Sequence, residues 1–247
     1  VFVGGSLPGD RVRARVTRRR KSFAEAVLVQ LLRPSDDRVK PVCRHAAVCG
    51  GCTWQELPYG RQLEVKRQHV RESVERIGGL DPSLVQPVLA CGRGLGYRNK
   101  MEYSFGTRRW LTPEEIASGE SFPQDGFYGG LHAPGRFDKI LDLQECHLQQ
   151  PVSFELLDFV REWCRTRNVE AYDPYRHEGF MRNLMIRTSD ASGEVMVNVV
   201  CNGEDYDLFA ALTEDLTAAF PRVSTLMFTI NDTRSPVARE GGGQIFR

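Results

Sequence analysis

Three cysteines near the start of the chain constrain its structure more than any other feature of the sequence. Cys43, Cys49 and Cys52 form a C-x5-C-x2-C pattern, and Gly50 and Gly51 separate the last two cysteines. Glycine lets the backbone adopt positive φ and brings amide N–H groups close to anionic sulfurs. This loop is therefore a candidate ligand for one small metal centre.

The identity of the metal centre depends on a fourth ligand, because iron–sulfur clusters are normally held by four cysteine thiolates. The remaining cysteines are Cys91, Cys146, Cys164 and Cys201. Cys164 lies beside Trp163 in a predicted amphipathic helix and Cys201 ends an apolar strand, so both are expected to be buried small hydrophobes. Cys91 and Cys146 lie in loop-like sequence, and spacing alone does not choose between them.

A zinc site is the alternative interpretation. Structural zinc usually takes paired C-x2-C knuckles, and this chain has one, Cys49 to Cys52. A zinc ligand set of cysteines together with His45 or His147 is also compatible with the sequence. The chain has seven cysteines in 247 residues and no sign of secretion, which favours reduced thiols over a disulfide framework.

The composition, 41% hydrophobic and 26% charged, is that of an ordinary soluble globular protein. No apolar run approaches the ~18 residues of a membrane span, and the first residues do not resemble a signal peptide. Because the chain does not begin with Met, we expect it to be a fragment.

The net charge is only +1, but positive charge is concentrated near the N-terminal end. The basic residues there are Arg11, Arg13, Arg15, Arg18, Arg19, Arg20 and Lys21. Such a stripe on a neutral protein indicates a polyanionic partner, or alternatively a strand edge that discourages aggregation. Alternation over 12–16 and the apolar run 24–29 predict a β-hairpin of a small barrel, with Val12, Ala14 and Val16 on its buried face.

Hydrophobic periodicity predicts an α+β layer in the rest of the chain. The expected elements are a helix through Leu63 and Ile77 closed by Gly78-Gly79, strands at 101–105 and 127–131 around a surface loop at 108–125, a helix at 152–166, a hairpin of 184–187 and 195–201, a helix through Leu208 and Leu216, and a strand at 223–230. Tyr97, Met101, Tyr103 and Phe105 are expected to be core residues.

The cysteine motif, Tyr97-Arg98-Asn99-Lys100 and Asp142-Leu143-Gln144-Glu145-Cys146 together resemble the iron–sulfur branch of the bacterial 23S rRNA (uracil-5-)-methyltransferases. In that family a small RNA-binding β-barrel, the TRAM domain, precedes a cluster-bearing segment, a central domain and a Rossmann-like methyltransferase domain. The resemblance covers essentially the whole chain. It implies that Cys146, rather than Cys91, completes a [4Fe-4S] ligand set with Cys43, Cys49 and Cys52.

The fold class implied by the resemblance is α+β and multidomain. Its parts are an incomplete OB-like TRAM barrel at 1–40, the iron–sulfur segment and helix at 41–92, and an RNA-binding central α/β domain at 93–247. We expect the Rossmann-like methyltransferase domain to be absent, because no helix follows the glycine run Gly241-Gly242-Gly243. We therefore assign no catalytic residue and no S-adenosylmethionine site, and predict that this fragment neither methylates RNA nor binds the cofactor appreciably.

The resemblance implies the N-terminal and central part of a class I S-adenosylmethionine-dependent RNA uracil-C5 methyltransferase that acts on 23S rRNA. In that family a cysteine thiolate adds to C6 of uracil, C5 takes the methyl group, and a carboxylate removes the C5 proton. This part of the enzyme is expected to supply RNA recognition and the cluster, and S-adenosylmethionine to bind only the full-length enzyme. We expect a cytoplasmic monomer with RNA as its partner and no membrane contact.

Phosphate contacts are expected from Arg18, Arg19, Arg20 and Lys21, and Phe23 is suited to stack on a base. The resemblance also implies that Arg98, Asn99 and Lys100 face substrate RNA. The alternative is that Arg98 and Lys100 pair with acids such as Glu102. Arg182 and Asn183 are further, secondary candidates.

Two other functions fit parts of the sequence. A radical S-adenosylmethionine enzyme can carry a TRAM domain, but such enzymes resemble one another by C-x3-C-x2-C, whereas the first gap here is five residues. A non-enzymatic zinc-binding RNA adaptor is the second. A brown protein absorbing near ~400 nm would favour iron–sulfur, and a colourless one with bound zinc would favour the adaptor.

Overall fold

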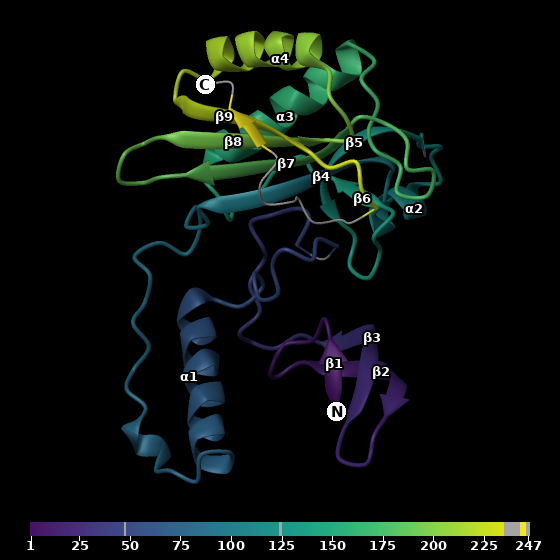
Figure 1. Cartoon of the computed structure of the whole chain (residues 1–247). Coiled ribbons are helices and arrows are strands. Elements are labelled where there is room, and N and C mark those ends of the chain that lie inside the picture. Colours follow the sequence, from purple (N-terminus) through teal and green to yellow (C-terminus); the bar gives the residue numbers. More distant parts are fainter. Residues whose placement is uncertain (47, 124, 235–242, 246–247) are drawn as a thin grey trace. The chain divides into compact units, whose positions relative to one another are not determined.

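The chain divides into two compact units in the computed structural model, which describes residues 1–46, 48–123, 125–234 and 243–245 (Figure 1). Unit 1 comprises Val1–Ala47 and Cys52–Gly94, and unit 2 comprises Val48–Gly51 and Leu95–Arg247. The boundary between the units therefore passes through the cysteine motif. The expected three domains, 1–40, 41–92 and 93–247, stay a prediction.

A three-stranded sheet with the order β1-β3-β2 forms the N-terminal part of unit 1. β2 (Arg11–Arg19) and β3 (Ala24–Arg33) form the predicted antiparallel hairpin, and β1 (Phe2–Gly4) pairs parallel to β3. The expected buried face of β2 is wrong, because Ala14 and Val16 are exposed. Three strands do not close a barrel that would cover this face.

One long helix follows the cysteine segment in unit 1. α1 (Tyr59–Arg76) ends before Gly78-Gly79, as predicted, and the backbone of Gly79 is left-handed with φ +63°. None of its residues is buried, and Ile77 just beyond it is exposed. The periodicity predicted the helix correctly but not the degree to which its apolar face is covered. The short 3-10 helix η1 (Pro82–Leu84) follows.

Unit 2 is built on a seven-stranded mixed sheet with the order β10-β9-β8-β7-β4-β5-β6. Its strands are β4 (Lys100–Arg108), β5 (Asp125–His132), β6 (Ile140–Asp142), β7 (Met181–Thr188), β8 (Val195–Cys201), β9 (Val223–Ile230) and β10 (Gly243–Ile245). β8 and β9 are parallel and the other neighbouring pairs are antiparallel. Gly241 and Gly242 of the C-terminal glycine run lie outside the described residues.

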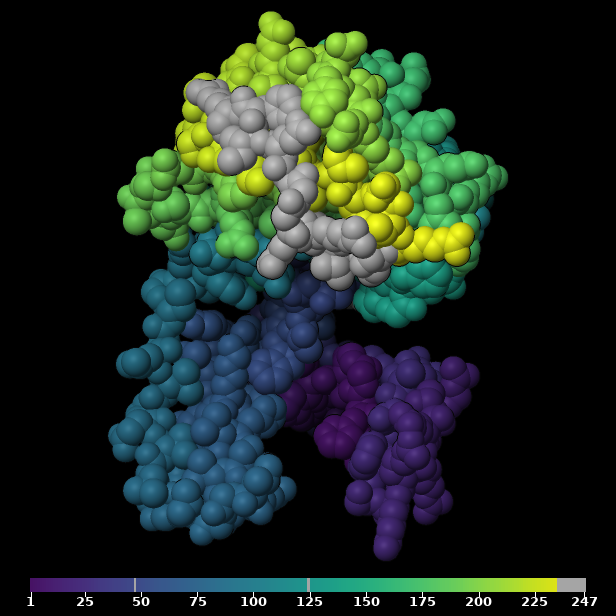
Figure 2. Space-filling view, in the orientation of Figure 1, coloured from purple at the N-terminus to yellow at the C-terminus, as the bar shows by residue number. Residues whose placement is uncertain are grey.

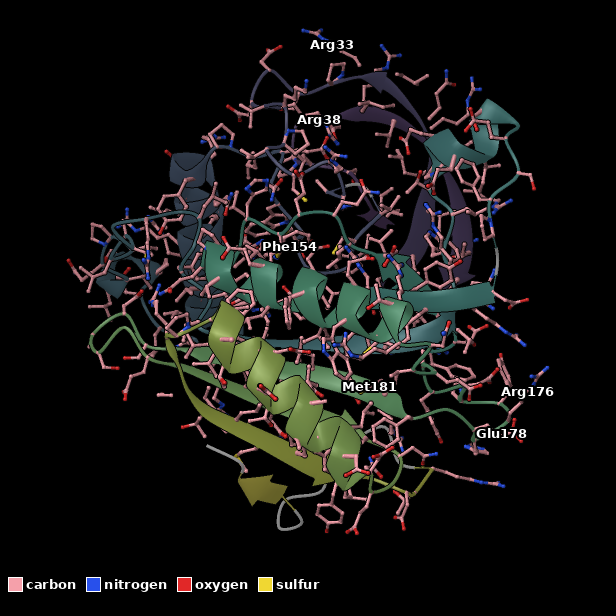
Figure 3. The ribbon with its side chains drawn as sticks, turned by 90° about the horizontal axis from the view of Figure 1, so that it is seen from above. Arg33, Arg38, Phe154, Arg176, Glu178 and Met181 are labelled. Carbon is pink, nitrogen blue, oxygen red and sulfur yellow. The ribbon has the colours of Figure 1, made fainter. Side chains whose placement is uncertain are left out.

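Two helices, α3 (Pro151–Thr166) and α4 (Tyr206–Ala219), cover one face of this sheet, as Figures 1 and 3 show from two directions. Both lie where the periodicity predicted them, and the Asp205 carboxylate caps α4 by accepting from the amide of Leu208. The core lies between these helices and the sheet. Among the described helices, none is long and apolar enough to cross a bilayer.

Strand alternation decides which aromatic residues enter this core. Met101, Tyr103 and Phe105 of β4 are buried, as predicted. Tyr97 is half exposed, so its expected place in the core is wrong. It precedes the first residue of β4, and the alternation of the strand does not extend to it.

The segment predicted as a surface loop, 108–125, contains a short helix. α2 (Pro113–Ser118) begins with a capping box in which the Thr112 hydroxyl accepts from the amide of Glu115 and the Glu115 carboxylate accepts from the amide of Thr112. A proline at the first helical position and a left-handed glycine, Gly119, after the end complete the usual pattern of helix start and stop.

Candidate functional site

In unit 1 one glutamine side chain links two of the cysteines. The Gln55 carbonyl oxygen accepts from the amide of Cys43 at 2.8 Å, and its amide group donates to the Cys52 sulfur at 3.6 Å. The amide of His45 donates to the Cys43 sulfur at 3.4 Å. Donors directed at sulfur favour the thiolate form, which is the form that binds metals.

An ion pair fixes the segment that carries these cysteines to the hairpin of unit 1. The Arg38 guanidinium donates to both carboxylate oxygens of Asp10, at 3.0 and 2.8 Å, and lies 2.6 Å from the Glu56 carboxylate. The Asp10 side chain is fully buried. The hydrogen bonds from Arg38 lower the pKa of Asp10 to about 2, so the carboxylate stays ionised at neutral pH.

The other two cysteines lie together in unit 2. Cys49 and Cys146 both pack against the main core. Burial raises the pKa of Cys49, and the nearby Cys146 adds to this effect. The amide of Gly51 donates to the Cys49 sulfur at 3.4 Å, and a Cβ on Gly51 would lie 3.3 Å from that sulfur and 3.4 Å from Leu131. The glycine therefore lets the backbone approach the thiol closely.

A buried hydroxyl near these two thiols has no hydrogen-bond partner among the described atoms. Tyr103 has no exposed surface, and its Oη atom accepts from and donates to no described group. Burial raises the pKa of Tyr103, and negative charge on Cys146 and Cys49 raises it further. The sequence predicted the burial of Tyr103 but gave no sign of this orphaned donor or of Gln55.

The other three cysteines lie in two kinds of environment, and the sequence predicted the buried one. Cys164 and Cys201 are fully buried, as expected. Burial raises the pKa of Cys164 to about 12 and also raises that of Cys201. Cys91 is exposed in unit 1, where its amide donates to the Tyr59 hydroxyl at 2.8 Å. Over the described ranges, no three His, Cys, Asp or Glu side chains form a group that fits a metal ion.

The basic hairpin presents its predicted RNA-binding residues to solvent. Arg18, Arg19, Arg20 and Lys21 are exposed at or next to its turn, and the hairpin is part of the purple N-terminal segment in the space-filling view (Figure 2). Phe23 is 40% exposed and contacts the ring of Phe2 edge-to-face at 5.9 Å. An exposed aromatic ring beside arginines is suited to stack on a base.

In unit 2 the segment 98–100 is also exposed. The backbone of Arg98 and Asn99 is used by the fold, since the Arg98 amide donates to the carbonyl of Leu148 and the Asn99 carbonyl accepts from Thr188. The ammonium of Lys100 lies 3.7 Å from the Glu102 carboxylate, which is the pairing that the alternative interpretation expected. Both side chains are partly exposed, so this pair contributes little to stability.

Arg182 makes several contacts within the fold, and its expected contact with RNA stays a prediction. It is buried, donates to the backbone carbonyls of Asn231 and Thr233, and lies over the ring of Tyr172 at 4.1 Å. Asn183 donates to the Ser104 hydroxyl at 3.1 Å. Both residues line a cavity that the sequence did not predict.

Comparison with known proteins shows similarity to RNA methyltransferases along almost the whole chain. No family model matches the sequence. An RNA methyltransferase of Porphyromonas gingivalis is 40% identical over 236 residues, which is 94% of this chain and 50% of that protein. One of Chlorobaculum tepidum is 40% identical over 240 residues, 96% of this chain and 50% of that protein. The chain thus spans about half the length of the curated relatives it matches.

A solved structure shares the fold. The tRNA (uracil-54, C5)-methyltransferase of Pyrococcus abyssi, in complex with S-adenosyl-L-homocysteine, matches with a TM-score of 0.64 and 26% identity. The match covers 99% of this chain and 50% of that one. This structure and the sequence relatives are thus similar to the chain along almost its whole length.

This match corrects the predicted fold class, which held that the methyltransferase fold is absent. Nearly the entire chain superposes on a methyltransferase chain, so the absence is wrong. The prediction was based on the absence of a glycine-rich strand-to-helix turn. Such a turn identifies one local phosphate-binding loop, and its absence says nothing about the sheet. The parallel unit β8–α4–β9 forms without such a loop, since Gly203 is the one glycine between β8 and α4.

Proposed function

We propose that the chain is part of an S-adenosylmethionine-dependent RNA (uracil-C5) methyltransferase. The observation that carries this proposal is the 40% identity to RNA methyltransferases over 94–96% of the chain. The fold match to a tRNA (uracil-54, C5)-methyltransferase supports uracil C5 as the target atom. That structure contains S-adenosyl-L-homocysteine, which is what remains when S-adenosylmethionine has given up its methyl group.

The proposed substrate is 23S rRNA, and the proposed location is the cytoplasm. The resemblance of the Cys43–Cys52 motif to the iron–sulfur branch of the 23S rRNA methyltransferases supports ribosomal RNA. The exposed basic turn at 18–21 with Phe23, and the exposed segment 98–100, are the proposed contacts to its phosphates and bases. The hairpin that carries the first of these is proposed to be part of a TRAM domain.

Cys43, Cys49, Cys52 and Cys146 are proposed to hold a [4Fe-4S] cluster. The donor set fits this group: thiolates are its usual ligands, amide groups of Gln55 and Gly51 donate to the sulfurs of Cys52 and Cys49, and the unpartnered Tyr103 hydroxyl lies near Cys49 and Cys146. When bound, the cluster supplies folding free energy rather than group transfer, since its ligands come from distant parts of the chain.

The methyl-transfer proposal is tested with the complete gene product that contains this chain. The protein is incubated with S-adenosylmethionine and either 23S rRNA or transfer-RNA transcripts, and the digested RNA is analysed by mass spectrometry. We expect 5-methyluridine in 23S rRNA, and release of tritium from RNA labelled at uracil C5. Modification of transfer RNA alone would reject the ribosomal substrate, and no 5-methyluridine in either RNA would reject the reaction.

A further inference from the structure

We propose that a cavity on the helix-free face of the unit 2 sheet binds an unstacked nucleobase of single-stranded RNA. Its volume is about 640 Å³, within the range of roughly 300–1,000 Å³ found for small-molecule sites. The proposal rests on the RNA substrate of the proposed function. It uses neither the cysteines nor the basic hairpin, so it can fail separately from them.

The position of the cavity follows from the pleat of two central strands. Glu102 and Ser104 of β4 point away from the helices because the residues that alternate with them enter the core. In β7 a register shift lies between Met181 and Asn183. This bulge lets the consecutive residues Arg182 and Asn183 line the same cavity.

Neutral hydrogen-bonding groups line the cavity. The Tyr172 hydroxyl is 2.8 Å from Nδ1 of His177, and the ring of Tyr172 forms part of the wall. Burial lowers the pKa of His132, so its imidazole is neutral at pH 7. Imidazole, amide and hydroxyl groups in the lining match the hydrogen-bonding edge of a planar heteroaromatic ring.

The charges around the cavity favour a ligand with an anionic tail. Glu102 lies 3.7 Å from the ammonium of Lys100, and Asp138 accepts from Arg136 at 2.8 and 2.7 Å. Both acids of the lining are therefore partly neutralised. Arg234 also lines the cavity and is exposed, so its guanidinium is available to contact a phosphate.

An exposed aromatic pair lies at the rim. The rings of Phe137 and Tyr175 are 5.6 Å apart, and these residues are 65% and 52% exposed. The Arg108 guanidinium lies over the ring of Tyr175 at 4.9 Å. Exposed rings next to arginine are a common platform on which the bases of single-stranded nucleic acids stack.

Local hydrogen bonds and backbone geometry constrain the loop that carries Tyr175. The Asp173 carboxylate accepts from the amide of Tyr175 at 2.7 Å, and His177 has the unusual backbone φ of +60°. Gly179 has φ +90°, and a Cβ there would lie 2.1 Å from the carbonyl oxygen of Ala171. These contacts limit the conformations open to the loop, which lowers the entropic cost of binding.

The test measures binding of a fluorescein-labelled, unstructured oligoribonucleotide by anisotropy, using the complete gene product. We expect Phe137→Ala to weaken binding roughly tenfold, the effect of removing one base-stacking contact, and Asn183→Ala to weaken it as well. Tyr206→Ala removes a similarly exposed ring from α4, on the other face of the sheet, and is expected to leave binding unchanged. Thermal melts verify that each variant is folded.

A second readout maps the contact directly. RNA that contains 4-thiouridine is expected to crosslink to the 172–178 loop or Phe137, and competition by duplex RNA is expected to be weak. Unchanged binding in both cavity variants, with RNA methylation intact, would overturn the cavity and leave the proposed function standing. Equal competition by duplex RNA would also overturn it, because phosphate contacts alone would then explain binding. If the unaltered protein neither bound nor methylated RNA, both proposals would be overturned.

Discussion

At the scale of single residues, partly and fully buried polar groups give the most specific information about the cysteine sites. Gln55 connects the amide of Cys43 to the sulfur of Cys52, and Tyr103 places an unpartnered hydroxyl near Cys49 and Cys146. A buried donor without a partner costs free energy comparable to a lost hydrogen bond. A bound cluster would remove that cost by supplying a sulfur acceptor.

Replacement of Tyr103 by phenylalanine tests this role. The cluster is expected to form with unchanged iron content, but its reduction potential is expected to fall, since hydrogen bonds to sulfur raise the potential of such clusters. Anaerobic redox titration of the variant measures the shift. Tyr128→Phe is the control, because the Tyr128 hydroxyl donates to the carbonyl of Pro123 instead. Equal potentials in Tyr103→Phe and the unaltered protein would rule out the hydrogen bond.

Asp10→Asn is expected to destabilise unit 1 by about 2 kcal/mol at pH 7, the free energy that corresponds to a pKa lowered from 3.8 to about 2. Because the folded-state pKa is the lower one, this stabilisation is present above pH 3.8 and is lost as the pH falls towards 2. Urea unfolding of both proteins at pH 7 and at acid pH measures the effect. Asp36→Asn, in an exposed pair with Arg33 at 3.9 Å, is expected to change little. Equal losses in the two variants would refute the role of Asp10.

At the scale of elements, one arginine joins α3 to the edge of the unit 2 sheet. The side chain of Arg161 is 7% exposed. It donates to the Asp142 carboxylate at 3.1 Å and to the carbonyl of Leu143 at 2.6 Å. The Asp142 carboxylate also accepts from the amide of Gly129 at 3.0 Å, which connects β6 to β5. The ion pair therefore fixes helix and strands together.

Arg161→Met is expected to destabilise unit 2 by about 2 kcal/mol, because the buried carbonyl of Leu143 loses this donor and the Asp142 carboxylate keeps only the partly exposed Arg165, at 3.3 Å, as an ion-pair partner. Denaturant unfolding followed by tryptophan fluorescence measures the loss. Arg167→Met removes a surface pair with Asp215, whose side chains are 44% and 42% exposed, and is expected to cost ~1 kcal/mol or less. A cost as small as that for Arg161→Met would contradict the role assigned to Arg161.

Apolar patterning predicted most elements of unit 2 because the core buries their apolar residues. α3, α4 and the β7–β8 hairpin lie where the apolar spacing indicated. α2 was missed, although Thr112, Pro113 and Glu115 form a helix-start signature, because the surrounding proline, serine and glycine residues are typical of loops. Sequence spacing also does not reveal that a bulge in β7 turns Arg182 and Asn183 to one cavity.

At the scale of the whole molecule, the sequence predicted the kind of relative correctly and the fold class wrongly. A glycine-rich loop is a local feature, and its absence does not exclude a methyltransferase fold, which depends on sheet pairings between distant segments. The same limit applies to the fourth cysteine. Spacing left Cys91 and Cys146 open, and the structure places Cys146 near Cys49 in unit 2 and Cys91 in unit 1.

Iron and acid-labile sulfide measured per chain in anaerobically purified protein test most directly whether Cys43, Cys49, Cys52 and Cys146 hold one cluster. We expect about four of each per chain, a brown protein, and loss of both colour and iron in Cys146→Ser but not in the matched Cys91→Ser. A folded protein that is colourless and contains zinc, or a Cys146→Ser variant with its full iron content, would contradict the cluster and its ligand set.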